Sequence, residues 1–222
     1  MTLLTCTNLS KSFQKQNQIF MILKQINLSI ESGERIVVIG KSGAGKSVLL
    51  SLVSGMDRAS DGDIQFDGQP YKTLSDDALN RLRIHDIGLI FQNLNLINSW
   101  TVLENVEAGL LRLSLKSQER RDLAVSWLEN VRLKDRLDHL PEHLSMGEQQ
   151  RVAVVRTLIR KPRLIIADEP TGDLDAETAE VIIRMLNDSV TENKAALLVA
   201  THGNYPLSQA DRVLKLENGI LN

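Results

Sequence analysis

The chain has 222 residues, of which 42% are hydrophobic, and its 26 basic and 28 acidic side chains give a formal net charge of −2. That length suits one globular domain with a sizeable core, and the near balance of charge excludes the strongly basic surface of a nucleic-acid binder. The single cysteine, Cys6, excludes an internal disulfide and favours a reducing compartment.

The apolar segments of the sequence indicate whether the chain is secreted or crosses a membrane. The N-terminus has no basic segment followed by a long apolar run, so we expect no signal peptide. The apolar runs at residues 35–40 and 163–167 are far too short to cross a bilayer and have the length of buried parallel strands. We therefore expect a soluble, cytoplasmic chain that reaches the inner face of the cell membrane only through a partner.

The first third of the chain predicts strands and one helix. Asp61-Gly62-Asp63 and Asp67-Gly68 are hairpin-turn signals on either side of a short strand. A glycine-rich turn follows an apolar strand, and a helix is expected over 46–52. The stretches expected to form strands are residues 3–9, 18–30, 35–40 and 64–66. This pattern favours a parallel-sheet core beside an antiparallel β-layer.

The middle of the chain is predicted to be helical. Thr101 and Glu104 have the spacing of a capping box, and residues 118–131 carry an apolar stripe with helical period. From Leu164 the pattern returns to α/β, with a helix over 177–190 and a strand over 196–200. A βαβ core that is interrupted by a helical insert explains this order.

Residues 40–47 match the phosphate-binding pattern G-x-x-x-x-G-K-[ST], and they lie between a buried strand and a helix, as that motif requires. Glycines allow positive φ and let backbone N–H groups converge on phosphate oxygens, and the helix adds its dipole. We expect Lys46 to reach the β- and γ-phosphates and Ser47 to ligate Mg²⁺. The predicted nucleotide-binding residues are Gly40, Lys41, Ser42, Gly43, Ala44, Gly45, Lys46, Ser47 and Val48.

Two adjacent acids, Asp168 and Glu169, end a predicted apolar strand. A strand buried on both faces should end in paired carboxylates only where they meet a cation or a reacting group. Downstream of a phosphate-binding loop, Asp168 is expected at the Mg²⁺ ion and Glu169 beside the attacking water as a general base. The two motifs together indicate a P-loop NTPase.

Ser145 and Glu148 have the S-x-x-E spacing of a second capping box. Capping does not explain Gly147, a small residue that allows close backbone approach at a helix N-terminus, which is an anion site. Residues 144–148, Leu-Ser-Met-Gly-Glu, resemble the Leu-Ser-Gly-Gly-Gln signature of the ATP-binding cassette family. The resemblance extends over nearly the whole chain, since the remaining motifs follow in the family's order.

The resemblance implies further site residues. Phe13 stands where the family stacks an aromatic ring on adenine, although a core aromatic remains an equal alternative. Gln92 resembles the Q-loop glutamine that reaches Mg²⁺ and the attacking water. Asp175 ends a Gly-Asp-Leu-Asp segment that resembles the D-loop at the dimer interface. His202 resembles the switch histidine at the γ-phosphate, and Ser145 and Gly147 belong to the signature.

The resemblance also implies a fold and an assembly. The fold is an α/β P-loop NTPase (RecA-like) core, residues 1–92 and 156–222, with an antiparallel β-subdomain and an α-helical insert, residues 93–155. Two copies would pair head to tail, so that Ser145 and Gly147 act in trans on Mg·ATP held by the partner's P-loop. Met146 replaces the first signature glycine, which questions how tightly the dimer closes, and Gly203 stands where an acid commonly follows the switch histidine.

The partner is expected to be a separate membrane permease that ATP hydrolysis drives. Residues 88–97, 137–141 and 170–175 resemble the branch of lipoprotein-release, macrolide-export and cell-division ATPases, whose permeases have few spans and a large extracytoplasmic domain. The apolar side chains Leu94, Leu96, Ile97 and Trp100 predict a docking groove near residues 92–106, unless they pack inside the insert. The alternatives are a cassette ATPase that acts on nucleic acid or ribosomes, and an interaction protein with an inactive site.

Overall fold

The computed structural model describes residues 1–15, 18–172, 174–203 and 205–222. The strands are β1 (Thr2–Lys15), β2 (Gln18–Glu31), β3 (Arg35–Ile39), β4 (Asp61–Phe66), β5 (Gln69–Pro70), β6 (Ile87–Ile90), β7 (Leu164–Asp168), β8 (Ala196–Thr201), β9 (Arg212–Glu217) and β10 (Ile220–Leu221). The helices are α1 (Lys46–Val53), α2 (Asp76–His85), α3 (Val102–Ala108), α4 (Ser117–Asn130), α5 (Met146–Leu158) and α6 (Ala176–Asn193).

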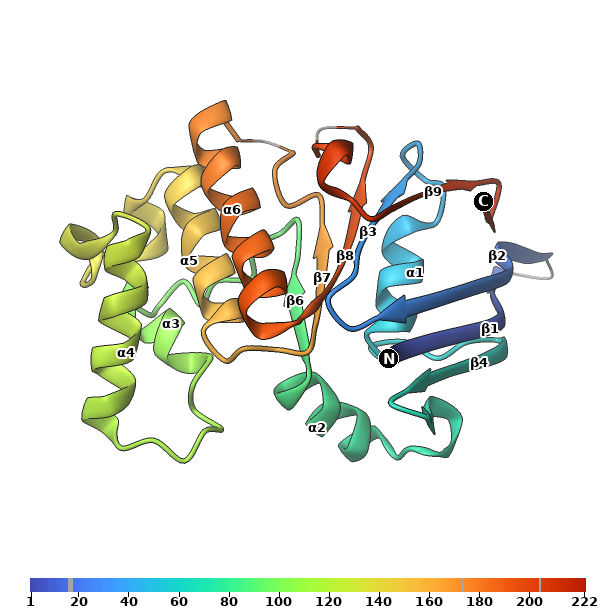
Figure 1. Cartoon of the computed structure of the whole chain (residues 1–222), viewed down its shortest axis with the longest axis horizontal. Coiled ribbons are helices and arrows are strands. Elements are labelled where there is room, and N and C mark those ends of the chain that lie inside the picture. Colours follow the sequence, from blue (N-terminus) through green and yellow to red (C-terminus); the bar gives the residue numbers. More distant parts are fainter. Residues whose placement is uncertain (16–17, 173, 204) are drawn as a thin grey trace.

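A six-stranded sheet in the order β10-β9-β3-β8-β7-β6 forms the centre of the protein. Its inner strands run parallel and are buried and apolar over most of their length, because helices or strands cover both of their faces. Helix α1 packs on one face together with the antiparallel layer, and α5 and α6 pack on the other (Figure 1). The carboxyl ends of β3, β7 and β8 therefore meet at one edge of the sheet.

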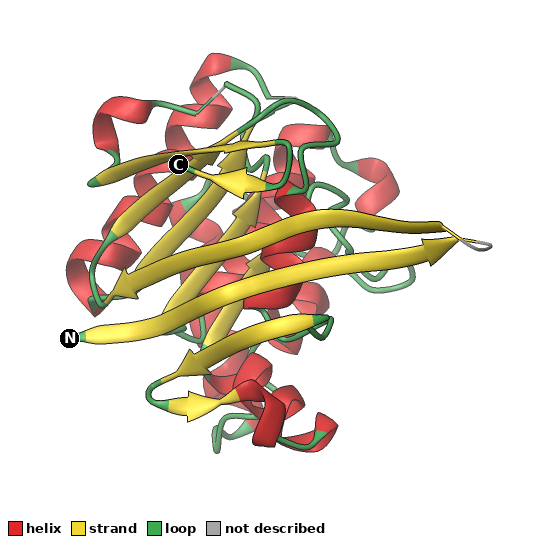
Figure 2. Ribbon diagram, turned by 90° about the vertical axis from the view of Figure 1, so that its right-hand side faces the viewer, coloured by secondary structure: helices red, strands yellow, loops and turns green. Residues whose placement is uncertain are grey.

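The antiparallel layer is a four-stranded sheet in the order β2-β1-β4-β5. Strands β1 and β2 are long, and their hairpin extends beyond the rest of the sheet (Figure 2). The predicted turn at Asp67-Gly68 is confirmed, since both residues have positive φ and join β4 to β5. The turn expected at Asp61-Gly62-Asp63 is wrong, because these residues lie inside β4. Gly62 (φ 82°) lies where the β1–β4 register shifts, and a Cβ there would lie 2.4 Å from the Asn8 carbonyl oxygen.

The helical insert packs around a core of its own, with α3, α4 and α5 as neighbours. The capping box at Thr101 and Glu104 is confirmed: the Thr101 hydroxyl accepts from the Glu104 N–H, and the Glu104 carboxylate accepts from the Thr101 N–H. Helix α5 joins the insert to the central sheet, because Val152 and Val155 belong to the core of the insert and Val154 to the core beside the sheet. The domain boundary at residues 155–156 stays a prediction.

The architecture confirms the predicted fold class of an α/β core with an antiparallel β-layer and a helical insert. The expected helices over 46–52, 118–131 and 177–190 correspond to α1, α4 and α6. Among the helices of the described residues, none is sufficiently long and apolar to cross a bilayer.

Candidate active site

The phosphate-binding loop connects β3 to α1, and its glycines are required by shape. Gly43 has φ 77° and Gly45 has φ 102°, which residues with a Cβ rarely adopt. A Cβ on Gly40 would lie 2.6 Å from the carbonyl oxygen of Leu216, the strand residue beside the loop. Gly45 is the N-cap residue of α1 and makes no side-chain cap, so this helix N-terminus leaves backbone N–H groups for a ligand.

Three of the predicted catalytic side chains converge at this edge of the sheet. Lys46 Nζ donates to the Gly40 carbonyl at 2.8 Å and lies 3.8 Å from Glu169 Oε1. His202 Nδ1 lies 2.7 Å from the same carboxylate oxygen. The side chains of Lys46 and Glu169 are 9% and 8% exposed, so their charges interact in a largely desolvated setting.

Glu169 has two features of a functional residue. Its backbone has φ 48°, a left-handed conformation that costs energy for any residue but glycine. Its second carboxylate oxygen, Oε2, is buried and has no hydrogen-bond partner among the described residues. A buried unpaired oxygen is costly, and in native proteins it points to a missing ligand, water or ion.

A cavity of about 510 Å³ contains this cluster. It joins the phosphate-binding loop to β1, to the end of β7 and to the Q-loop segment. Its lining residues are Phe13, Ile22, Ser42, Gly43, Gly45, Lys46, Ser47, Val48, Gln92, Asp168, Glu169 and His202. The structure thus brings together in one place most of the residues that the sequence assigns to nucleotide and metal binding.

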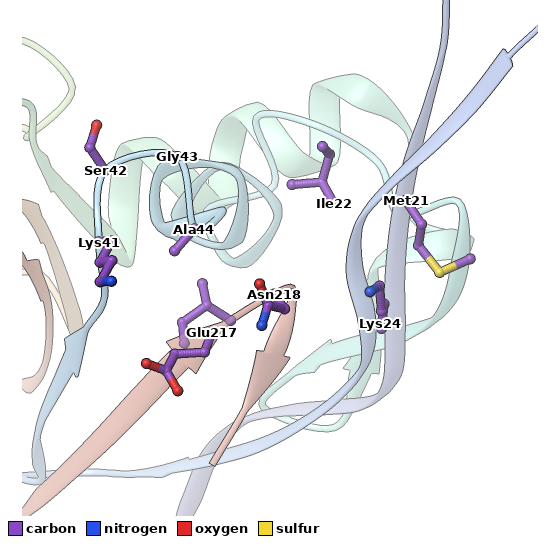
Figure 3. Close-up of a pocket in the computed structure, with 11 residues that line it drawn as sticks. Met21, Ile22, Lys24, Lys41, Ser42, Gly43, Ala44, Glu217 and Asn218 are labelled. Atoms are coloured by element: carbon purple, nitrogen blue, oxygen red, sulfur yellow. The ribbon is translucent and has the colours of Figure 1, made fainter.

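A second cavity, of about 550 Å³, lies on the outer side of the same loop. Lys41 and Ala44 face it from the phosphate-binding loop, Met21 and Lys24 from β2, and Asn218 from the turn between β9 and β10 (Figure 3). Its described lining residues include neither of the paired acids nor the histidine. The predicted catalytic residues therefore line the first cavity, of about 510 Å³, which we call the inner cavity.

Ser145, Gly147 and Asp175 are not among the described lining residues of either cavity. Ser145 caps α5, and the backbone N–H of Ser145 holds the pKa of Glu148 below its usual range. Asp175 caps α6 by accepting from the backbone N–H and hydroxyl of Thr178, and the backbone hydrogen bond lowers the pKa of Asp175. Both residues thus have a helix-capping role within the chain. Asp173, in the same D-loop segment, lies outside the described residues.

The structure explains why glycine stands at positions 147 and 203. A Cβ on Gly147 would lie 3.1 Å from the Thr178 side chain, so a small residue lets the first turn of α5 pack against α6. Gly203 has φ 137°, a backbone conformation that L side chains rarely adopt, which explains why no acid follows His202. Met146, the departure from the signature, is 57% exposed at the first turn of α5.

The apolar residues after Gln92 do not form the predicted groove. Leu94 is buried, and Leu96 packs against the core of the insert, whereas Ile97 is 37% exposed. A neighbouring cavity of about 360 Å³ lies between α2, β6 and the carboxyl ends of α3 and α5. Arg83, Arg112, Arg156 and Arg160 line it together with apolar residues, and no acid is among its described lining residues.

Sequence reasoning missed two residues whose contacts lie beside the site. Lys11 lies beside the Phe13 ring on the same strand and pairs with Asp57, which is far away in the sequence. Asn105 fixes the segment after Gln92 through its buried amide. A lone polar residue inside an apolar helical stripe was the only available signal for Asn105.

The strand–loop–helix unit, the paired acids at the end of a nearby parallel strand and the histidine at the end of the strand between them define a P-loop NTPase. Residues 23–172 match the ABC transporter family. The chain therefore belongs to the ABC transporter family as one of its ATP-hydrolysing cassettes.

Its relatives agree in length and fold. The lipoprotein-releasing system ATP-binding protein LolD of Pseudomonas syringae is 39% identical over 98% of this chain and 96% of its own length. An uncharacterized ABC transporter ATP-binding protein, YvrO of Bacillus subtilis, is 38% identical over 99% and 95%. Among solved structures, the cassette MJ0796, described as a dimer in a post-hydrolysis state bound to ADP and Pi, has a TM-score of 0.93 at 34% identity. That match covers 99% of this chain and 97% of the other.

Proposed function

We propose that this cassette hydrolyses Mg·ATP in the inner cavity with Glu169 as the general base. The observation that carries the proposal is the convergence of Glu169, Lys46 and His202 at one edge of the sheet. Lys46 offsets phosphate charge, and Glu169 accepts a proton from the attacking water. His202 contacts the Glu169 carboxylate through its Nδ1, and its side chain is 53% exposed, which leaves the ring accessible to a bound phosphate.

The cavity also fits a magnesium ion. Ser47, Asp168 and Gln92 supply hydroxyl, carboxylate and amide oxygens, the hard donors that Mg²⁺ prefers. No cluster of three or more acidic, histidine or cysteine side chains suited to a metal occurs in the part of the chain that the structure describes. Such a sparse set suits an ion that takes most of its ligands from phosphate and water. These three residues would hold the ion beside the phosphates, where it would offset their negative charge.

The remaining site residues act across a homodimer in this proposal. Ser145, Gly147 and Asp175 lie outside the inner cavity of their own chain, at the N-termini of α5 and α6. A helix N-terminus attracts anions, so the α5 N-terminus of one copy can complete the phosphate site of another. The dimeric cassettes of known structure support this arrangement.

Glu169→Gln tests the base and the dimer together. The substitution removes the base but keeps a side chain of the same shape, so ATP stays bound and links the two copies. Light scattering of the purified variant should show a doubling of mass with Mg·ATP and none with Mg·ADP. Adding Lys46→Ala to this variant should abolish the doubling of mass. The control is Glu217→Gln, which changes an exposed glutamate near the phosphate-binding loop and should give the same light-scattering result as the wild-type chain. A monomeric Glu169→Gln at saturating ATP would contradict the composite site.

The partner we propose is a few-span permease of the kind served by lipoprotein-release and macrolide-export ATPases, here at the inner face of the cell membrane. The relatives named LolD support this branch. The arginine-lined cavity is the proposed docking place, since Arg156 bonds the carbonyls of Leu94 and Asn95 and so connects it to the Q-loop segment. Arg112 is exposed and has no ion pair or hydrogen bond among the described residues, which leaves its charge for a partner.

Arg112→Glu should abolish permease stimulation of hydrolysis while the basal ATPase activity of the isolated cassette stays at the wild-type level. Arg121→Glu, a charge reversal on α4, is the matched control. A charge at Leu96 would not give a clean test, because Leu96 packs in the core of the insert. Full permease-stimulated activity in Arg112→Glu would place the docking surface elsewhere.

A further inference from the structure

Lys11 makes a contact that the catalytic arrangement does not use. It lies two residues before Phe13 on β1, and its ammonium nitrogen lies 5.0 Å from the centroid of the Phe13 ring. A cation at this distance from an aromatic face is attracted by the ring. Phe13 is 46% exposed and is the aromatic side chain among the described lining residues of the nucleotide cavity, so the contact bears on that cavity.

The ammonium group is itself held in a fixed place. Lys11 Nζ is 2.8 and 2.7 Å from the two carboxylate oxygens of Asp57 and donates to the Arg58 carbonyl at 2.7 Å. The Lys11 side chain is 11% exposed and that of Asp57 is 37% exposed, so the ammonium is largely shielded from water while the carboxylate is partly exposed. Three bonds on one ammonium leave it little freedom, and the ring beside it is correspondingly restrained.

Asp57 belongs to the turn that leaves α1, the helix that begins at Lys46. The Asp57 N–H donates to the Ser51 carbonyl of that helix at 3.2 Å. The contact chain therefore runs from the phosphate-binding loop along α1 to Asp57, then to Lys11 and to the Phe13 ring. Both ends of the nucleotide cavity are attached to the same short helix.

From this geometry we infer that Lys11 is a positioning residue for the nucleotide base: with Asp57 it orients the Phe13 ring at a fixed distance from the phosphate cradle. The inference rests on the proposed stacking of adenine by Phe13. Lys11 itself makes no direct contact with the nucleotide in this arrangement. Because Lys11 acts only through the Phe13 ring, it should strengthen binding of the base and should not affect binding of the phosphates.

The backbone of β1 has contacts at this point that do not involve the Lys11 side chain. The backbone on either side of Lys11 is held separately, since the Ser60 N–H donates to the Ser10 carbonyl and the Ser12 N–H to the Ser60 hydroxyl. Lys11→Met keeps the length and apolar stem of the side chain and removes the charge. Loss of the charge should therefore free the ring without displacing β1.

The test is displacement of a fluorescent ATP analogue from the full chain by ATP and, separately, by inorganic tripolyphosphate. Lys11→Met should weaken ATP binding about threefold to tenfold and leave tripolyphosphate unchanged. Phe13→Ala should weaken ATP about tenfold or more. The double variant should bind ATP no more weakly than Phe13→Ala alone. Lys11→Arg, which keeps a cation able to pair with Asp57, should bind as wild type, and Lys72→Met, beside the same β-layer, is the control.

Several results would overturn the inference. Equal weakening of ATP and tripolyphosphate in Lys11→Met would indicate a general structural role, and additive effects in the double variant would show that Lys11 does not act through Phe13. If Lys11→Met does not fold, Asp57→Asn releases the same ammonium and must give the same loss of ATP selectivity. An unchanged ATP affinity in Phe13→Ala would instead refute the stacking role itself, which separates failure of the proposed site from failure of the positioning pair.

Discussion

The buried amide of Asn105 should be essential for the order of the segment that follows the Q-loop. Asn105 is fully buried on α3. Its Oδ1 accepts from the Ile97 N–H at 2.8 Å, and its Nδ2 donates to the carbonyls of Ile97, Trp100 and Thr101 at 3.1, 3.1 and 3.0 Å. One side chain thus fixes residues 97–101 against the helix.

The cost of Asn105→Ala follows from counting the groups that lose their partner. The Ile97 and Thr101 carbonyls each keep a backbone donor, from Trp100 and from residue 105. The Ile97 N–H and the Trp100 carbonyl lose the only partner seen among the described residues. At about 1–3 kcal/mol for each unsatisfied group, and with partial hydration near exposed Ile97, we expect a loss of about 2–4 kcal/mol in the free energy of unfolding.

Urea denaturation of the nucleotide-free protein measures that loss as a lower midpoint at an unchanged slope. Hydrogen exchange should show protection lost at Ile97 and retained in β7 and β8. Asn130→Ala, at the exposed end of α4, is the control and should change the free energy of unfolding by less than about 0.5 kcal/mol. A loss below about 1 kcal/mol in Asn105→Ala with exchange at Ile97 unchanged would refute the role.

Three further predictions concern single groups. Lys46→Ala should lower steady-state ATP hydrolysis at least about a hundredfold, with the circular dichroism spectrum preserved, and near wild-type turnover would contradict the site. Burial raises the pKa of the Cys6 thiol to about 12, so at pH 8 Ellman's reagent should not react with the folded protein and should detect one thiol once the protein is denatured. The pKa of Glu148 is lower in the folded state than in the unfolded state, so its ionised form stabilises the fold above the unfolded pKa, and this stabilisation is lost as the pH falls. In Glu148→Gln the urea midpoint should therefore decline less on acidification than it does in the wild type.

The phosphate-binding half of the site was predictable because its determinants are local. Strand, glycine turn and helix are contiguous in sequence, and the turn geometry at Gly43 and Gly45 follows from residue type alone. The acids at the end of β7 were predictable for a related reason, since a buried apolar strand seldom ends in two charged side chains unless a cation or a reacting group lies beside them. Parallel order in the sheet then brings the ends of β3, β7 and β8 together.

What the sequence could not predict depends on contacts between distant segments. The closeness of Gly147 to Thr178 requires the crossing of α5 and α6, which no local pattern specifies. The apolar residues after Gln92 suggested a groove, but tertiary packing directs Leu94 and Leu96 inward. The contact between Lys11 and Asp57 joins a strand to a loop beyond the next helix, and a charged residue on a strand gives no indication of its partner.

The geometry of Glu169 supports the proposal that the chain needs a nucleotide and a second copy to hydrolyse ATP. Its left-handed backbone carries the carboxylate inward, where Lys46 and His202 lie beside Oε1 while Oε2 remains buried and unpaired. Lys46 Nζ and His202 Nδ1 both lie beside this one oxygen, and in the proposed mechanism these contacts must loosen before the carboxylate can take a proton. Bound phosphate competes for the Lys46 ammonium, and a water hydrogen-bonded to Oε2 would satisfy the orphaned oxygen. The α5 N-terminus, which we propose completes the charge around the γ-phosphate, is not among the described lining residues of the same cavity. In the proposed mechanism hydrolysis is therefore coupled to closure of the dimer, because each contribution that would release Glu169 for catalysis comes from a different binding event.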